Sequence, residues 1–212
     1  MLKKIAEAIE QYGNVDAVFF DGVEDDGEHQ DPMRRIPLNQ MQCVDSGKQY
    51  LLEHYRERNL NVEACLYAYR REFLDGENLR FREGILHEDV EFTPRILMQC
   101  GKVAEIPDQV YHYLVRENSI STQKNKEKNI RDLFQTLRKQ DQMADQQEPE
   151  LKKWMKNAIL DSYLNMVQTA RMYQKQYRKL LDKRFLLGKA ATNWNRFRVL
   201  ICLINVDRKS VV

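Results

Sequence analysis

The feature that most constrains this chain is an abrupt change in its composition near Ser121. Before that residue, glycines and prolines separate short apolar runs, whereas only Pro149 and Gly188 occur after it. Glycine and proline end helices and form turns, so a long stretch nearly free of both favours continuous helices. The sequence therefore predicts a mixed α/β part followed by an all-α part.

The first residues predict a helix followed by a buried strand. Apolar residues repeat with helical spacing up to Gly13, which is placed to end the helix. The run 16–20 (DAVFF) is rich in strand formers and lies between turn residues. The polar, glycine-containing segment 21–32 that follows is typical of a loop or the tip of a hairpin.

The next segments alternate between helix and strand signals. Ser46 can cap a helix that runs through Leu52. Residues 62–74 (VEACLYAYRREFL) suit a strand that enters a short helix.

Two further elements complete the α/β part. A helix is expected from about Glu88 to Cys100, with Gly101 as its stop. Residues 102–116 (KVAEIPDQVYHYLVR) look like two short strands around a Pro-Asp turn.

The all-α part has clear helical periodicity. One amphipathic helix is expected around Phe134, and Pro149 can open the next. An apolar stripe then continues in steps of four and three from Ile159 to Leu180, which predicts one long helix. Such a stripe usually packs on its own domain, although it could also dock on a partner.

Composition excludes several classes of protein. Lys plus Arg (34) nearly balances Asp plus Glu (32), and acids and glutamines share the faces of the basic helices, so no nucleic-acid partner is expected. The four cysteines lie far apart without metal-ligand spacing, which fits a reducing cytoplasm. No apolar run is long enough to be a signal peptide or to cross a bilayer. We expect a cytoplasmic protein, compatible with a place at the inner face of the membrane.

Two acidic clusters are candidates for chemistry. The acids of segment 21–31 lack the spacing of a known metal loop, so a solvated loop is the favoured interpretation. Glu88 and Asp89 open a helix, where the backbone N–H groups and the helix dipole stabilise carboxylates. Acids in a first helical turn are common, and the residues alone favour simple capping over catalysis.

A resemblance changes that balance. The segments "ACLYAYRREFLDGENLRFREGILHEDVEFTPRIL" and "VYHYLVRENSIST" resemble the acceptor-side half of bacterial family 2 glycosyltransferases, inverting enzymes of the GT-A fold. The resemblance covers roughly Val15 to Thr122. It implies a Rossmann-like α/β fold class, the C-terminal part of a GT-A domain followed by the helical tail.

The resemblance also implies roles for individual residues. Asp89 matches the general base that deprotonates the acceptor hydroxyl, and Glu88 matches a neighbouring acid that positions it. Phe92 matches the aromatic residue that anchors the helix. Arg116 and Ser119 match a segment that closes over the donor phosphates, as an arginine is suited to do.

The departures from the family pattern are equally specific. The family holds a Mg or Mn ion against the diphosphate with an Asp-x-Asp motif, and this sequence contains no such motif. We therefore expect 1–122 to be the acceptor-side half of a catalytic domain, 123–206 to be a helical region, and the isolated chain to be inactive. Residues 207–212 (DRKSVV) are expected to be a non-native tail, because a common sequencing adapter encodes them in frame.

Two hypotheses of function remain at this stage. The first is transfer of a sugar from a nucleotide-sugar donor to a hydroxyl of a glycan or lipid-linked acceptor, with inversion, in the synthesis of a surface polysaccharide. The second is a non-catalytic helical module that docks on a partner protein or a membrane face. No metal ligand is assigned within the chain.

Overall fold

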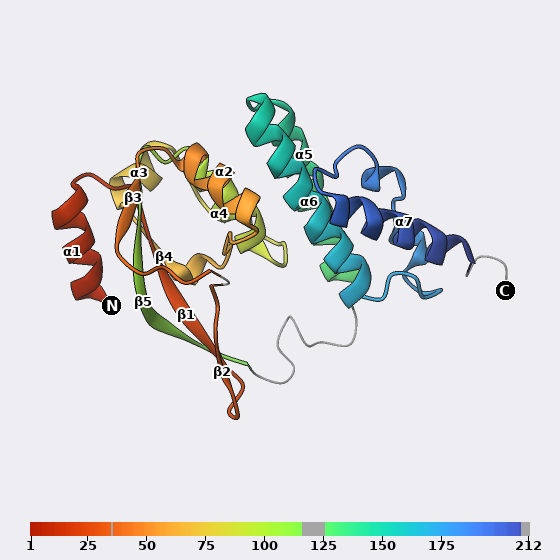
Figure 1. The fold of residues 1–212 in the computed structure, drawn as a ribbon, viewed down its shortest axis with the longest axis horizontal. Helices are drawn as coiled ribbons and strands as arrows, with labels where there is room; N and C mark the ends of the chain where they lie inside the picture. The colour runs from red at the N-terminus through yellow and green to blue at the C-terminus, as the bar shows by residue number, and fades with distance from the viewer. Residues whose placement is uncertain (35, 116–125, 209–212) are drawn as a thin grey trace. The chain divides into compact units, whose positions relative to one another are not determined.

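The chain folds into two compact units. The computed structural model describes residues 1–34, 36–115 and 126–208, with the backbone alone for 205–208. The units are Met1–Gln123, which is mixed α/β, and Lys124–Val212, which is helical (Figure 1). The predicted fold class is confirmed.

A mixed sheet organises the first unit. The strands are β1 (Ala17–Asp25), β2 (Gln30–Pro32), β3 (Gln42–Val44), β4 (Tyr67–Tyr69) and β5 (Val103–Leu114). β1 lies parallel to β5 on one side, and on its other side it pairs antiparallel with β4 and β2. β3 pairs antiparallel with the outer side of β5, giving the strand order β2-β1-β5-β3.

Helices cover both faces of this sheet. They are α1 (Leu2–Tyr12), α2 (Gly47–Glu57), α3 (Arg71–Gly76) and α4 (Glu88–Leu97), with a 3-10 turn at Ala64–Leu66. Ala8 of α1 packs on Val18, Phe20 and Ile106, whose side chains share one face. Phe19 and Glu105 alternate to the opposite face, which α2 and α4 cover (Figure 1).

Several short-range predictions are confirmed. α1 ends at Gly13, which has φ +76 and whose N–H bonds back to the carbonyl of Ile9. Ser46 caps α2 through a hydrogen bond from the Gln49 N–H to its hydroxyl. α4 begins at Glu88 as predicted but ends at Leu97, three residues before the predicted end.

Both long strands differ from prediction. β1 continues through Asp25, so of the two alternatives predicted for 21–32, a loop or the tip of a hairpin, the structure has the hairpin, with its tip at 26–29. The predicted pair of strands at 102–116 is wrong, because β5 is one strand. The Pro-Asp pair at 107–108 and residue 110 have no partner on β1, so the strand accommodates them as bulges rather than as a turn.

In the described residues of the second unit, the α-helices are α5 (Glu127–Asp145), α6 (Pro149–Thr169) and α7 (Asn193–Arg208), with 3-10 turns at Arg178–Leu180 and Arg184–Leu186. Pro149 opens α6 as predicted. The prediction of one helix from Ile159 to Leu180 is wrong, because α6 ends at Thr169. Arg171 adopts the left-handed conformation (φ +50) and the Met172 N–H bonds to the carbonyl of Val167, which closes the helix. In the described part of the chain, the helices are too short or too polar to cross a membrane.

Candidate functional site

The start of α4 and the bend before β4 (residues 61–66) meet beside the carboxyl-terminal halves of the parallel strands β1 and β5, where Tyr111 pairs with Gly22. Thr93 is fully buried and its hydroxyl donates a 2.6 Å hydrogen bond to the carbonyl of Val62. Thr93 lies one turn after Asp89 on α4, so both residues share the helix face that contacts this bend. Ligands of parallel α/β sheets commonly bind at this end of the strands.

Asp89 occupies the first turn of α4. His87, immediately before the helix, has φ +58, an uncommon conformation for a residue with a side chain. The Val90 N–H donates to the Asp89 carboxylate at 2.8 Å. Burial raises the pKa of Asp89 and the charge of Glu88 adds to this, while the Val90 N–H works against it.

Glu88 differs from its neighbour because its side chain is exposed. Its charge nevertheless acts on the Asp89 carboxylate, as the pKa of Asp89 shows. The predicted pair therefore consists of one half-buried acid and one solvated acid.

A second half-buried acid lies beside Asp89. Burial raises the pKa of Glu63 and the charge of Asp89 raises it further, although the N–H groups of Glu63 and Val62 and the side chain of Asn61 partly offset this. The Glu63 Oε2 atom is buried without a hydrogen-bond partner in the described part of the chain. A buried polar atom in that condition is costly, by roughly 1 to 3 kcal/mol.

Cys65 and Tyr111 complete this group. Burial raises the pKa of the Cys65 thiol, and the charges of Glu63 and Asp89 add to the rise. The interaction between Cys65 and the Tyr111 hydroxyl in turn raises the pKa of Tyr111. We call these four residues, drawn from three separate segments, the Asp89 cluster: Glu63, Cys65, Asp89 and Tyr111.

Aromatic packing fixes the helix that carries Asp89. Phe92 is 3% exposed and stacks on Phe81 with ring centroids 3.8 Å apart. Tyr69 meets Phe92 edge to face at 6.0 Å, and the Arg95 guanidinium lies 5.7 Å from the Phe92 ring centre. Phe92 therefore anchors α4 against β4.

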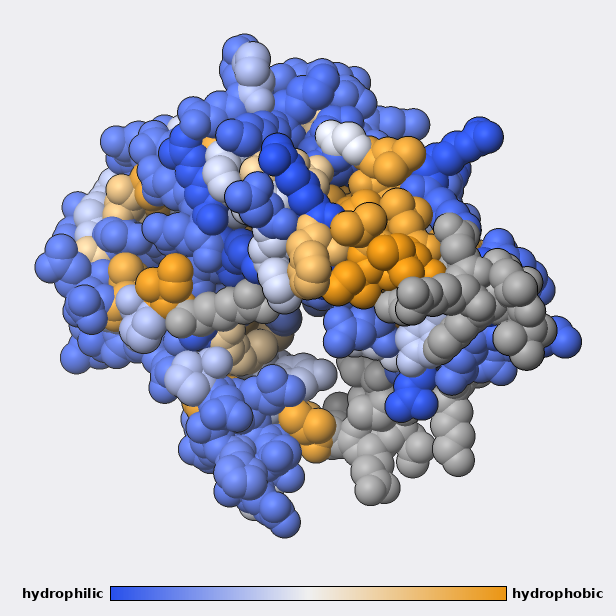
Figure 2. Space-filling model, turned by 45° about the vertical axis from the view of Figure 1, so that its right-hand side comes forward, coloured by the Kyte–Doolittle hydropathy of each residue, from blue (hydrophilic) through white to orange (hydrophobic). Residues whose placement is uncertain are grey.

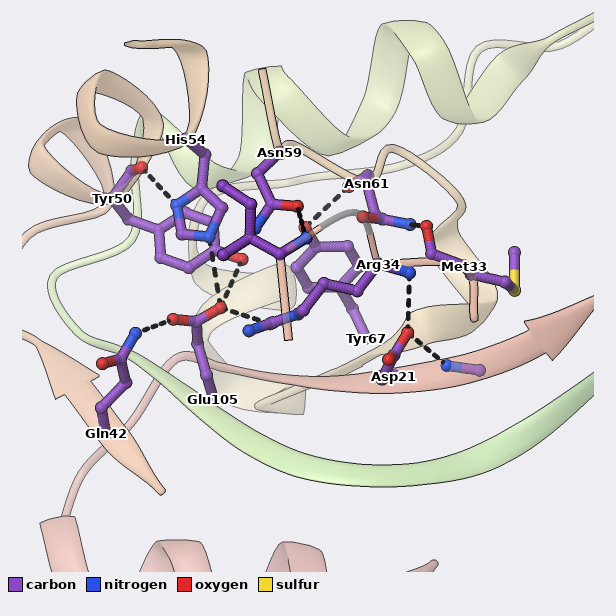
Figure 3. Close-up of polar contacts among 12 residues, drawn as sticks. Asp21, Met33, Arg34, Gln42, Tyr50, His54, Asn59, Asn61, Tyr67 and Glu105 are labelled. Carbon is purple, nitrogen blue, oxygen red and sulfur yellow. Dashed lines mark hydrogen bonds and ion pairs between the residues drawn. The ribbon is translucent and has the colours of Figure 1, made fainter. Parts of the chain in front are cut away.

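A buried polar network lies on the same face of the sheet (Figure 3). Arg34 donates to Glu105 Oε1 at 2.6 Å, and His54 Nε2 lies 3.3 Å from the same oxygen. Gln42 and Tyr50 also donate to this carboxylate. Burial pushes the pKa of Glu105 upward, but the His54 hydrogen bond and charge, Arg34 and Gln42 outweigh it and hold the pKa at about 2.

Asp21 corrects one interpretation of the sequence. It is 5% exposed, so it does not belong to a solvated acidic loop. Its carboxylate accepts from the N–H groups of Gly22 and Arg34 at 2.8 and 3.0 Å (Figure 3). Asp21 therefore fixes the backbone position of Arg34, whose side chain reaches Glu105.

Further hydrogen bonds connect this network to the bend that carries Glu63 (Figure 3). Asn61 donates to the Met33 carbonyl at 3.1 Å, and the Tyr67 hydroxyl donates to the Asn61 carbonyl at 2.8 Å. The buried network thus fixes the backbone two residues before Glu63.

Two predicted site residues, Arg116 and Ser119, lie outside the described residues. Within the described ranges, no three His, Cys, Asp or Glu side chains converge as metal ligands would. The described residues therefore do not fit the Mg or Mn ion that the resemblance implies.

Sequence reasoning missed two acids, Glu63 and Glu105. Each is the single acid within an otherwise apolar run, VEACL and VAEI. An acid that is buried within an apolar run almost always has a charged or hydrogen-bonding partner. A single acid in an apolar run was therefore the sequence signal that could have revealed these two residues.

Comparison with known proteins places the fold. No family model and no curated protein matches the chain. Solved structures match the chain, among them S. aureus TarS 1-349 (TM-score 0.58) and the same protein in complex with UDP-GlcNAc (TM-score 0.60). Both are 12% identical over 98% of this chain. The chain spans about three fifths of the TarS chains, 59% and 61%. It has a glycosyltransferase-like fold.

Proposed function

We propose that this chain forms the acceptor-side half of an inverting family 2 glycosyltransferase that acts in surface polysaccharide synthesis. The observation that carries the proposal is the position of Asp89, half-buried at the start of α4 in a cluster that reaches Tyr111 in the carboxyl-terminal half of β5. The glycosyltransferase-like fold supports it, as does the UDP-GlcNAc held by one TarS structure.

In this proposal Asp89 is the general base. Its ionised carboxylate accepts the proton of the acceptor hydroxyl while that oxygen attacks the anomeric carbon of the donor. The nucleoside diphosphate leaves from the opposite side of that carbon, so a single displacement inverts its configuration. The raised pKa of Asp89 makes it a stronger base than a solvated aspartate. Glu88 acts through Asp89 as a positioning and electrostatic neighbour.

The donor side of the reaction requires further residues. The sequence contains no Asp-x-Asp motif, and the described residues do not fit a metal. We propose that residues outside these 212 hold the donor and its Mg or Mn ion, and that Arg116 and Ser119 contact the donor phosphates. The isolated chain should then not turn over nucleotide sugars. We use "full-length enzyme" for a protein that carries these residues together with such a donor site.

The test is Asp89→Asn in the full-length enzyme. Loss of the base should lower kcat by about a hundredfold or more. Nucleotide-sugar binding and the thermal unfolding temperature should not change, because asparagine preserves the shape of the side chain. Asp31→Asn, an exposed aspartate on β2, is the matched control and should retain activity. Full turnover by Asp89→Asn would refute the proposal.

A second candidate function, a module that docks on a partner protein or membrane face, rests on α7. The stripe from Ile159 to Tyr177 packs inside the second unit, so it is not a free docking surface. α7 instead exposes large apolar side chains, and apolar residues gather into a patch in Figure 2. These side chains are Trp194, Phe197, Leu200, Ile201 and Ile204.

This docking candidate has its own test. Phe197→Ser with Ile201→Ser should abolish co-sedimentation of the chain with lipid vesicles if α7 binds a membrane. If the double variant co-sediments with vesicles as much as the wild type does, α7 is not a membrane-binding surface. A cytoplasmic place at the inner face of the membrane is the location we propose for either function.

A further inference from the structure

The Asp89 cluster contains a carboxylate that the proposed base catalysis does not use. Glu63 Oε2 is buried and lacks a hydrogen-bond partner within the described residues. The fully buried carboxylate of Glu105, by contrast, receives four donors. Since proteins rarely leave a carboxylate oxygen unsatisfied, the unpaired atom of Glu63 calls for a donor that arrives with a ligand.

The backbone around Glu63 fixes its position relative to Asp89. The Thr93–Val62 bond joins the residue before Glu63 to the face of α4 that carries Asp89. Asn61, one residue earlier, is held by Met33 and Tyr67. On the other side, the Leu66 N–H donates to the Glu63 carbonyl at 3.0 Å. The backbone is therefore held before and after Glu63, as a positioning residue requires.

The Glu63 side chain can present its free oxygen to a ligand. The residue is only partly buried, and the terminal torsion of a glutamate is broad and nearly two-fold. A partial rotation about this torsion can therefore move the buried Oε2 atom toward the surface without moving the backbone. The exposed Cys65 and the partly buried Tyr111 border the same place, so a polar ligand can approach.

We propose that Glu63 is a substrate-positioning residue, which accepts a hydrogen bond from a second hydroxyl of the acceptor while Asp89 takes the proton of the attacking hydroxyl. This inference rests on the proposed function. It assigns the acceptor to polyhydroxylated compounds with two neighbouring hydroxyls, such as sugars, and disfavours acceptors with one isolated hydroxyl. The two acids have different roles: Asp89 accepts the proton of the attacking hydroxyl, and Glu63 orients the acceptor.

The first experiment uses the 212-residue chain. Carboxyl carbons are labelled with carbon-13, and the titration of Glu63 is followed by NMR in the wild type and in Asp89→Asn. Removal of the Asp89 charge should lower the pKa of Glu63. Glu83→Gln, at an exposed acid of the same unit, should leave the Glu63 titration unchanged. A Glu63 titration that is the same in Asp89→Asn as in the wild type would show that the two acids are not a pair, and would overturn the inference.

The second experiment measures kinetics in the full-length enzyme. UDP-GlcNAc is the donor, and the acceptor probes are the methyl glycosides of glucose, galactose and N-acetylglucosamine. Glu63→Gln should raise the acceptor KM about tenfold or more and leave kcat within about threefold, because the lost bond is made in the ground state as well as in the transition state. Glu63→Asp keeps the charge and should give a smaller rise in the acceptor KM. This variant also replaces Glu63→Gln in the test if the glutamine variant does not fold.

The outcomes separate this inference from the proposed function. If Asp89→Asn keeps full turnover, the proposed function fails and the role of Glu63 fails with it. If Asp89→Asn is inactive while Glu63→Gln has the acceptor KM of the wild type, only the role of Glu63 is overturned. A wild-type enzyme that uses none of the methyl glycosides, yet uses an acceptor with one isolated hydroxyl, overturns the acceptor class.

Discussion

Glu105 provides the sharpest test of the forces that hold the first unit together. Its pKa of about 2 lies below its ordinary value of 4.5, although its side chain is fully buried. At about 1.4 kcal/mol per pH unit, the ionised carboxylate stabilises the folded unit by about 3 kcal/mol at neutral pH. Glu105→Gln should remove this contribution and leave the buried Arg34 without its partner.

The sign of the pH dependence follows from the lowered pKa. The stabilisation is complete above the ordinary pKa of 4.5 and is lost as the pH falls toward 2. Between about pH 5 and about pH 3, the wild type should therefore lose about 2 kcal/mol more than Glu105→Gln. Glu57→Gln, an exposed acid on α2, is the control and should follow the wild type.

The assay separates the two units. Trp154 and Trp194 are the only tryptophans in the sequence and both belong to the second unit, so their fluorescence reports on that unit alone. Urea unfolding of the first unit is followed by the NMR resonances of β1 and β5. A difference between wild type and Glu105→Gln that stays constant from about pH 5 to about pH 3 would refute the reasoning. A change in stability that appears only in the tryptophan fluorescence, which reports on the second unit, would also refute the reasoning.

Other predictions concern packing and accessibility. Gly47→Ala should destabilise the first unit by about 2 kcal/mol or more in urea unfolding, since a Cβ would lie 1.8 Å from the Leu97 carbonyl oxygen; a neutral result would contradict this packing. Thr93→Val should cost about 1 kcal/mol and speed hydrogen exchange in the bend before β4, because the hydroxyl bond to that bend is lost. Cys65 should react with a thiol reagent first and Cys100 last, measured by mass spectrometry, because Cys65 is exposed and Cys100 buried.

The sequence revealed elements whose signals are local. Gly13, Ser46 and Pro149 act through their own backbone or side chain, and each ends or begins a helix where predicted. The single strand β5 was missed because its bulges depend on pairing with β1, more than 70 residues earlier. The end of α6 was missed because the apolar pattern continues to Tyr177, which is buried although the helix has stopped.

The candidate site was likewise predictable from the sequence only in part. A resemblance in sequence selected Asp89 as the candidate base, whereas local capping signals alone did not distinguish it from an ordinary first-turn acid. Glu63 and Tyr111 are far apart in the sequence, and only the folded chain brings them to Asp89. Their roles in the cluster arise from tertiary contacts that no local pattern encodes.

The parallel pairing of β1 with β5 has a consequence for synthesis of the chain. β5 begins at Val103, 78 positions after β1 ends at Asp25. At roughly 5 to 20 residues per second, a ribosome needs about 4 to 16 seconds to make that intervening stretch. During that time the apolar edge of β1 has no partner strand on that side. The newly made chain is therefore exposed to aggregation over this interval, and a chaperone that shields β1 would act in this window.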